Sequence, residues 1–298
     1  MPGYQTLIVL FGTLLLGIAA GSVGTFSVLR RRALLGDVIA HAALPGLCVA
    51  FLAFHSRSIG VLLTGALLSG LMGAVCVSLL KRFTQLKDDT VQGIVLSVFY
   101  GAGIALTRTI QNLYPNEPGA DLESFIIGRA ATMLKSDVYQ IAAAAVLTSV
   151  IVVMFYKELK LVSFDEQFCQ VQGKSATFLD VLLMILTAVT VVVGLPAVGV
   201  VLTAALLIIP PAAARFWTDR LSKMLVIASA FGGVSGIVGT LISARFDGLP
   251  TGPVIVLTAT TLFVVSWIIA PHRGLISQMA RRGTLVTEAP EFEGGDLR

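Results

Sequence analysis

The chain has 298 residues, of which 56% are hydrophobic and 13% are charged, and its formal net charge is +4 at pH 7. Its mean hydropathy is +0.89, whereas soluble domains carry about 25% charged residues. This composition excludes an ordinary soluble domain and indicates an all-α, polytopic membrane helical bundle. Its surroundings are a lipid bilayer, and no nucleic-acid partner is expected.

Uncharged runs mark the expected membrane spans, since about 20 apolar residues cross the bilayer core. In chain order these runs are 1–29, 38–56, 58–80, 91–107, 138–156, 181–214, 224–244 and 248–271. The run 181–214 is too long for one ordinary span. Gly194-Leu195-Pro196 interrupts it, and proline breaks a helix interior. We expect two helices there, near 176–194 and 199–214, and therefore eight or nine spans.

Lysine and arginine counts predict the orientation, because cytoplasmic loops carry an excess of both. Alternate loops together with the C-terminal tail hold 16 of the 21 basic residues, and the opposite side holds 5. The first set is expected in the cytoplasm, and with nine spans the N-terminus lies outside. We expect a membrane domain over residues 1–275 and a cytoplasmic tail over 276–298, which is polar and disordered.

The loop Gln111–Lys135 contains Glu117, Asp121 and Glu123, followed by the apolar residues 125–128. A partial helix that dips into the outer leaflet fits this pattern. Acidic residues at an outer mouth also attract cations. The alternative is a merely solvated loop.

Asp37 and His41 are four residues apart inside an apolar run, so they share one face of a helix. A carboxylate at the bilayer centre costs about 2.5–3.5 kcal/mol. An oxygen and a nitrogen ligand on one face suggest a site for a divalent cation. Alternatively, Asp37 caps the second helix or pairs with the arginines at 30–32, and His41 is a hydrogen-bonded core residue.

Pro45 lies four residues beyond His41, so the helix cannot form the backbone hydrogen bond to the His41 carbonyl. We expect the helix to bend there and to line a cavity. A single pair of ligands is too few for an ion that needs four to six. The sequence therefore predicts a dimer with the site at its interface.

The loop 157–175 is charged and amphipathic, and either Ser163 or Asp165 could cap a short helix in it. Phe164 and Phe168 would share the apolar face of that helix, which suits docking of a partner, although an ordinary surface loop is the alternative. The sequence Gly173-Lys174-Ser175 lacks the first glycine of a phosphate-binding loop. We therefore expect no ATP binding in this chain and no enzyme activity of its own.

Four segments resemble the ABC-3 family, the membrane permeases of bacterial manganese, zinc and iron ABC importers. The first segment, residues 29–46, reads LRRRALLGDVIAHAALPG, and the others are 88–94, 160–168 with Gly173, and 198–214. They occur in the family's order and cover roughly residues 7–275. One departure is Pro210-Pro211, where the family usually has a single proline.

The resemblance implies the fold of type II ABC importers, similar to the vitamin B12 permease. It implies a multi-pass protein of the bacterial plasma membrane that works with a second permease subunit, identical or paralogous. Two copies of a separate ABC ATPase and an extracytoplasmic metal-binding protein or lipoprotein complete the system. By resemblance, Asp37 and His41 line the metal pathway, and Phe164, Asp165 and Phe168 belong to the ATPase-coupling loop.

We therefore expect the permease subunit of an ATP-driven importer for divalent transition metals, with no permanently bound cofactor. Manganese is the first choice, because it suits mixed oxygen and nitrogen ligands and the chain has only 3 histidines. Zinc is second, and iron is a further option. The alternatives are a permease of the same architecture for metal chelates, a secondary transporter driven by an ion gradient, and a non-transporting scaffold.

Overall fold

The computed structural model describes residues 3–55, 58–113, 128, 133–246, 249–272 and 274–277, and this part of the chain contains helices and no strands. The helices are α1 (Tyr4–Leu29), α2 (Leu35–Phe54), α3 (Ile59–Phe83), α4 (Asp88–Leu113), α6 (Lys135–Met154), α7 (Tyr156–Phe164), α8 (Glu166–Val171), α9 (Ala176–Trp217), α10 (Leu221–Arg245) and α11 (Thr251–Ile269). All except α7 and α8 are long and apolar enough to cross a membrane, which gives eight candidate spans in the described part. The predicted all-α membrane bundle is confirmed.

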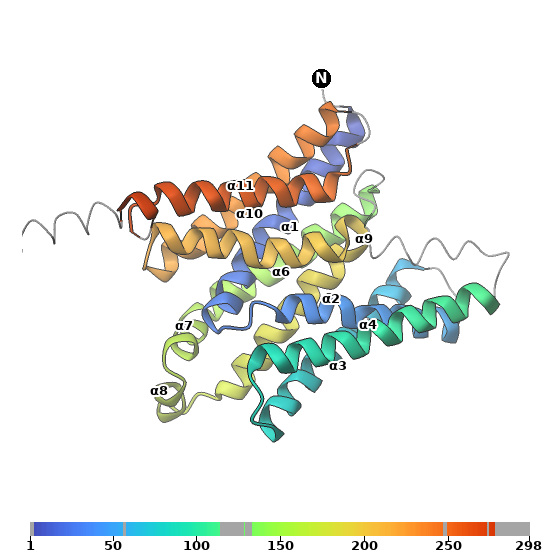
Figure 1. Cartoon of the computed structure of the whole chain (residues 1–298), viewed down its shortest axis with the longest axis horizontal. Helices are drawn as coiled ribbons and strands as arrows, with labels where there is room; N and C mark the ends of the chain where they lie inside the picture. The colour runs from blue at the N-terminus through green and yellow to red at the C-terminus, as the bar shows by residue number, and fades with distance from the viewer. Residues whose placement is uncertain are drawn as a thin grey trace, which may run out of the picture.

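The helices form two groups that α9 joins (Figure 1). One group contains α2, α3 and α4, which contact one another, and the other contains α1, α6, α10 and α11. Helix α9 contacts α2 and α3 of the first group and all four helices of the second. It is therefore the central element of the bundle.

Helix α9 is 42 residues long, which at 1.5 Å per residue is about 63 Å and twice the thickness of a bilayer core. Gly199 interrupts it with φ 82° and ψ 172°, a backbone conformation essentially restricted to glycine. The chain reverses direction there, so the first half of α9 starts at the same end of the bundle toward which the second half runs. Asp180 of the first half pairs with Arg30, and Leu207 of the second half lies against Gly36.

The two helices predicted within this run are thus the two halves of α9. The predicted break at Gly194-Leu195-Pro196 is misplaced, because helical structure continues through Pro196 to Gly199. The physical reason is that proline only removes a hydrogen bond and tilts the helix, whereas the backbone angles at this reversal require a glycine. Gly128, also at positive φ, lies directly against the Val198–Gly199 peptide.

Small residues allow the helix backbones to approach closely. Gly17 of α1 faces Gly232 of α10, and a Cβ on either residue would overlap the carbonyl of the other. Thr13 strengthens the same contact, because its hydroxyl lies 3.1 Å from the Thr240 hydroxyl and donates to the Gly236 carbonyl at 3.3 Å. This is the packing expected in membranes, where apolar helices gain little from excluding water and rely on close contact.

The predicted outer loop lies largely outside the described residues, which include only its ends and Gly128. Most of the predicted tail, from residue 278 onward, also lies outside them.

Candidate metal site

Asp37 lies in the first turn of α2, and its Oδ1 is 3.4 Å from Nε2 of His41, one helical turn further on. Leu34 occupies the N-cap position of α2, and no side chain caps it. Asp37 is therefore not the helix cap that one alternative reading of the sequence offered. Nor does an ion pair join it to Arg30 or Arg32, which instead pair with Asp180. The Asp37 carboxylate therefore has His41 as its ion-pair partner among the described residues.

The pair lies on an open face of a helix that is otherwise buried. The Asp37 side chain is 33% exposed and that of His41 is 21% exposed. Pro45 and Val49 continue the same accessible stripe at four-residue intervals, and the residues on either side of the stripe are buried. Both potential ligands therefore lie on the accessible side of α2 and not in the core of this chain.

Tyr100 of α4 is a member of the site that the sequence did not predict. Its ring meets the His41 ring edge-on, with centroids 4.9 Å apart and an interplanar angle of 78°. The nearby Gly101 and Gly103 are a weak sequence signal for a tyrosine that faces another helix. His41 Nδ1 is buried, and no described group hydrogen-bonds to it. The ring edge contact and the Asp37 carboxylate therefore set the orientation of the imidazole.

One chain provides only a partial ligand set. Within the described residues, no group of three or more His, Cys, Asp or Glu side chains could hold a metal ion. Asp37 and His41 supply one oxygen and one nitrogen atom, which is fewer than the four to six ligands that divalent transition metals take.

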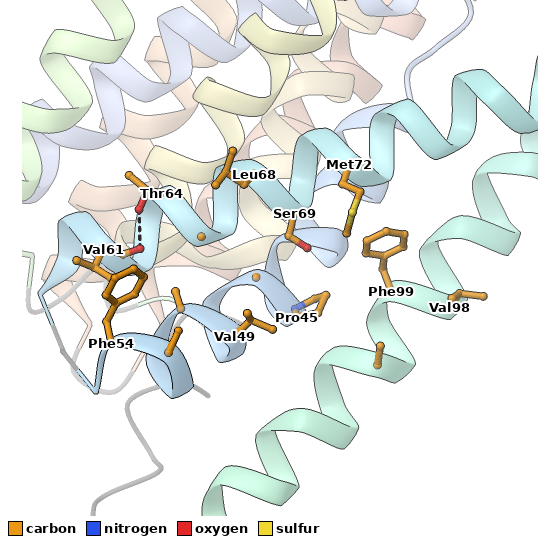
Figure 2. A pocket seen from close by; sticks show the side chains of 15 residues that line it. Pro45, Val49, Phe54, Val61, Thr64, Leu68, Ser69, Met72, Val98 and Phe99 are labelled. Atoms are coloured by element: carbon orange, nitrogen blue, oxygen red, sulfur yellow. Dashed lines mark hydrogen bonds between the residues drawn. The ribbon is translucent and has the colours of Figure 1, made fainter.

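An apolar groove of about 610 Å³ continues the accessible face of α2 beyond Pro45 (Figure 2). Pro45, Val49 and Phe54 line it from α2. Leu68 and Met72 face it from α3, and Val98 and Phe99 from α4. The Ser69 hydroxyl also lines the groove but donates to the Ala42 carbonyl at 2.6 Å. The groove therefore offers shape and apolar surface, while the candidate ligands lie at the Asp37 end of the stripe.

The loop predicted to dock a partner consists of the two short helices α7 and α8. Asp165 caps α8, because its Oδ1 accepts a hydrogen bond from the Phe168 amide at 2.8 Å. Ser163, the other predicted cap, instead donates to the Leu159 carbonyl within α7. Phe164 and Phe168 are 59% and 49% exposed, so two large apolar side chains project from a charged surface.

Glu158 and Lys174 fasten the two ends of this loop together, with 2.6 Å between Oε1 and Nζ. The hydrogen bond from Lys174 holds the pKa of the Glu158 carboxyl below its usual range. The pair therefore favours the folded loop wherever the carboxylate is ionised.

Comparisons with known proteins agree with this fold. The model of the ABC 3 transport family matches residues 4–270. A zinc transport system membrane protein, TroC of Treponema pallidum, is 47% identical over 274 residues, which are 92% of each chain. A manganese transport system membrane protein, MntC of Bacillus subtilis, is 45% identical over 92% of this chain, although the match spans only 62% of that relative.

Two solved structures share the architecture. PsaBC from Streptococcus pneumoniae, solved in complex with a Fab, superposes with a TM-score of 0.80 at 30% identity and covers 93% of this chain and 96% of that one. An inward-facing transporter of the metal-chelate ABC type has a TM-score of 0.68 at 19% identity over 87% and 84% of the two chains, which supports the fold alone. From the match across residues 4–270 and these relatives, the chain belongs to the ABC 3 transport family.

Proposed function

We propose that the chain is the permease subunit of an ATP-driven importer for a divalent transition metal, with manganese as the first choice and zinc as the second. Membership of the family supports transport, and the Asp37–His41 pair on an accessible face of α2 carries the proposal. Residues 1–275 form the permease domain, and the ATPase is a separate subunit.

The spacing of the two side chains suits joint binding of one ion. Asp37 Oδ1 and His41 Nε2 are 3.4 Å apart. If an ion formed bonds of about 2.0–2.2 Å to both atoms, the oxygen–metal–nitrogen angle would be roughly 100–115°. That range includes the tetrahedral angle that zinc prefers, whereas manganese, which usually takes octahedral geometry, would need a narrower angle between the two ligands. Two protein ligands from one chain leave the remaining coordination positions to a second subunit or to water.

A second permease subunit, identical or paralogous, would bring two further ligands to the same ion. The accessible face of α2 is the place where the two subunits would meet, with the ion between them. Two ABC ATPase subunits would bind the α7–α8 loop, and an extracytoplasmic binding protein would deliver the metal. The excess of basic residues supports a cytoplasmic location for this loop and the C-terminus in a bacterial cell.

Uptake of manganese into proteoliposomes that contain the permease, its ATPase and its binding protein tests the proposal. Asp37→Ala and His41→Ala should each reduce ATP-dependent uptake to background while the complex still assembles. The matched controls are Asp219→Ala and His272→Ala, which alter an exposed Asp–His pair 4.0 Å apart elsewhere in the chain. Wild-type uptake by both site variants would refute the site, and uptake without the ATPase would favour a secondary transporter.

A further inference from the structure

A cluster of ion pairs joins the turn between α1 and α2 to the start of α9. Nη2 of Arg30 lies 2.8 Å from Asp180 Oδ1, and Nη2 of Arg32 lies 3.1 Å from Asp180 Oδ2. Each oxygen of one carboxylate thus lies within ion-pair distance of a different arginine of the same turn, and Arg32 also donates a hydrogen bond to Oδ2. Glu166 of α8 also belongs to the cluster, since its Oε2 lies 3.4 Å from Arg30 Nη2. Two arginines and two carboxylates leave it without net charge.

Three members of the cluster are largely shielded from solvent, whereas the Glu166 side chain is 53% exposed. The side chains of Arg30, Asp180 and Arg32 are only 8%, 17% and 19% exposed. Arg30 Nη1 also donates to the Val162 carbonyl of α7 at 3.3 Å. Exposed ion pairs contribute little to stability, but removing one partner of a shielded pair leaves a charge without compensation. These contacts therefore constrain how α7, α8 and α9 can move relative to the turn.

On one side, the cluster is fixed to the loop that carries Phe164 and Phe168. A small apolar core holds α7, α8 and the start of α9 together; it consists of Val162, Cys169, Ala176 and Leu179. Asp180 directly follows this core in the sequence. A displacement of the exposed loop is therefore expected to carry the Asp180 carboxylate with it.

On the other side, the cluster is fixed to the start of α2. The Arg32 amide donates to the Ser27 carbonyl at 2.8 Å, and the Leu35 amide donates to the Arg32 carbonyl at 3.0 Å. Asp37 follows within the first turn of α2. Because hydrogen bonds span the turn, a shift of Arg32 is transmitted to the backbone that positions the Asp37 carboxylate.

We propose that Arg30, Arg32 and Asp180 are positioning residues that transmit movement of the α7–α8 loop to the Asp37–His41 pair. This inference rests on the proposed function, since it requires an ATPase subunit that binds Phe164 and Phe168. None of the three residues binds the metal. They determine whether ATP hydrolysis in the ATPase subunit bound to the loop changes the geometry of the ion ligands on α2.

The test is the number of manganese ions moved per ATP hydrolysed in the full reconstituted complex. Asp180→Asn should still assemble with the ATPase and hydrolyse ATP, yet this ratio should fall by roughly tenfold or more. The reason is that Arg32 loses its carboxylate and Arg30 keeps only the more distant Glu166. Asp180→Glu, which keeps the negative charge, should restore part of the manganese-to-ATP ratio. Asp219→Asn is the matched control, since it makes the same change in an exposed Asp–His pair that involves neither the turn nor the loop, and it should keep the wild-type ratio.

A double variant shows whether the residues act as one unit. Arg32→Gln combined with Asp180→Asn should lose no more than the worse of the two single variants. Wild-type ratios in both single variants, or losses that multiply in the double variant, would overturn the inference. If Asp180→Asn does not assemble, Arg32→Gln alone decides, because Arg32 is the most exposed of the three.

The same preparation separates this inference from the proposed function. If Asp37→Ala and His41→Ala abolish uptake while Asp180→Asn keeps the wild-type ratio, only the transmission role is wrong. If the two site variants transport manganese normally, the metal site itself is wrong, whatever Asp180→Asn does.

Discussion

Gly17 of α1 and Gly232 of α10 lie backbone to backbone, so that a methyl group on either would occupy the position of the other's carbonyl. Gly17→Ala should therefore destabilise the permease by about 1–3 kcal/mol, the usual cost of overpacking. Thermal unfolding in detergent measures this. Gly93→Ala is the control, because a Cβ at that position meets nothing within 4 Å. Equal unfolding temperatures for the two variants would contradict the close contact.

Tyr100 should act on His41 through its ring. Tyr100→Phe keeps the edge contact and should leave the KM for manganese uptake within about twofold of wild type. Tyr100→Ala removes a contact worth about 0.5–1.5 kcal/mol and should raise KM by roughly two- to tenfold. Kinetics in proteoliposomes distinguish the two variants. An equal loss in Tyr100→Phe would mean that the hydroxyl, and not the ring, matters.

Phe164 should bind the ATPase subunit. Because this side chain is 59% exposed in the isolated chain, Phe164→Asp should leave the fold intact while it places a charge in an apolar contact. We expect the ATPase to be lost from the purified complex. Phe246→Asp is the control, since Phe246 is similarly exposed at the far end of α10. Normal co-purification of Phe164→Asp would contradict the docking role.

Gly199 should be intolerant of any side chain. Its φ of 82° and ψ of 172° are available to glycine alone, and forcing another residue into this region costs about 1–3 kcal/mol. Gly199→Ala should therefore lower the unfolding temperature, whereas Val201→Ala, at an exposed helical position in the same half of α9, should change it little. Equal temperatures would mean that the reversal of α9 is not fixed by this residue.

Glu158 should make the stability of the loop depend on pH. Its pKa is lower in the folded chain than the ordinary value of 4.5. The stabilisation is therefore fully present above pH 4.5 and is lost as the pH falls through the lower, folded-state pKa. Glu158→Gln should be less stable than wild type at pH 7, and the difference should shrink at acidic pH below 4.5. A difference that does not change with pH would exclude this ion pair as its source.

Much of the fold could be predicted from the sequence, because the lipid bilayer restricts the structures that an apolar chain can adopt. In a bilayer, the backbone must satisfy its own hydrogen bonds, so long apolar runs form helices wherever they occur. The expected all-α bundle and the family resemblance are confirmed, although α4 extends to Leu113, beyond the predicted end of that span at residue 107. The break in α9 was misplaced, because proline gives a stronger sequence signal than the one glycine whose backbone angles make the turn.

By itself, the sequence determined the periodic relationships: the helices, the shared face of Asp37 and His41, and a helix cap at either Ser163 or Asp165. Each depends on residues within one or two helical turns, where spacing fixes geometry. Tertiary structure alone decided that Tyr100 lies against the His41 ring and that Arg30 and Arg32 bind Asp180 and not Asp37. These contacts join residues far apart in the chain, and only the packing of α2, α4 and α9 brings them together.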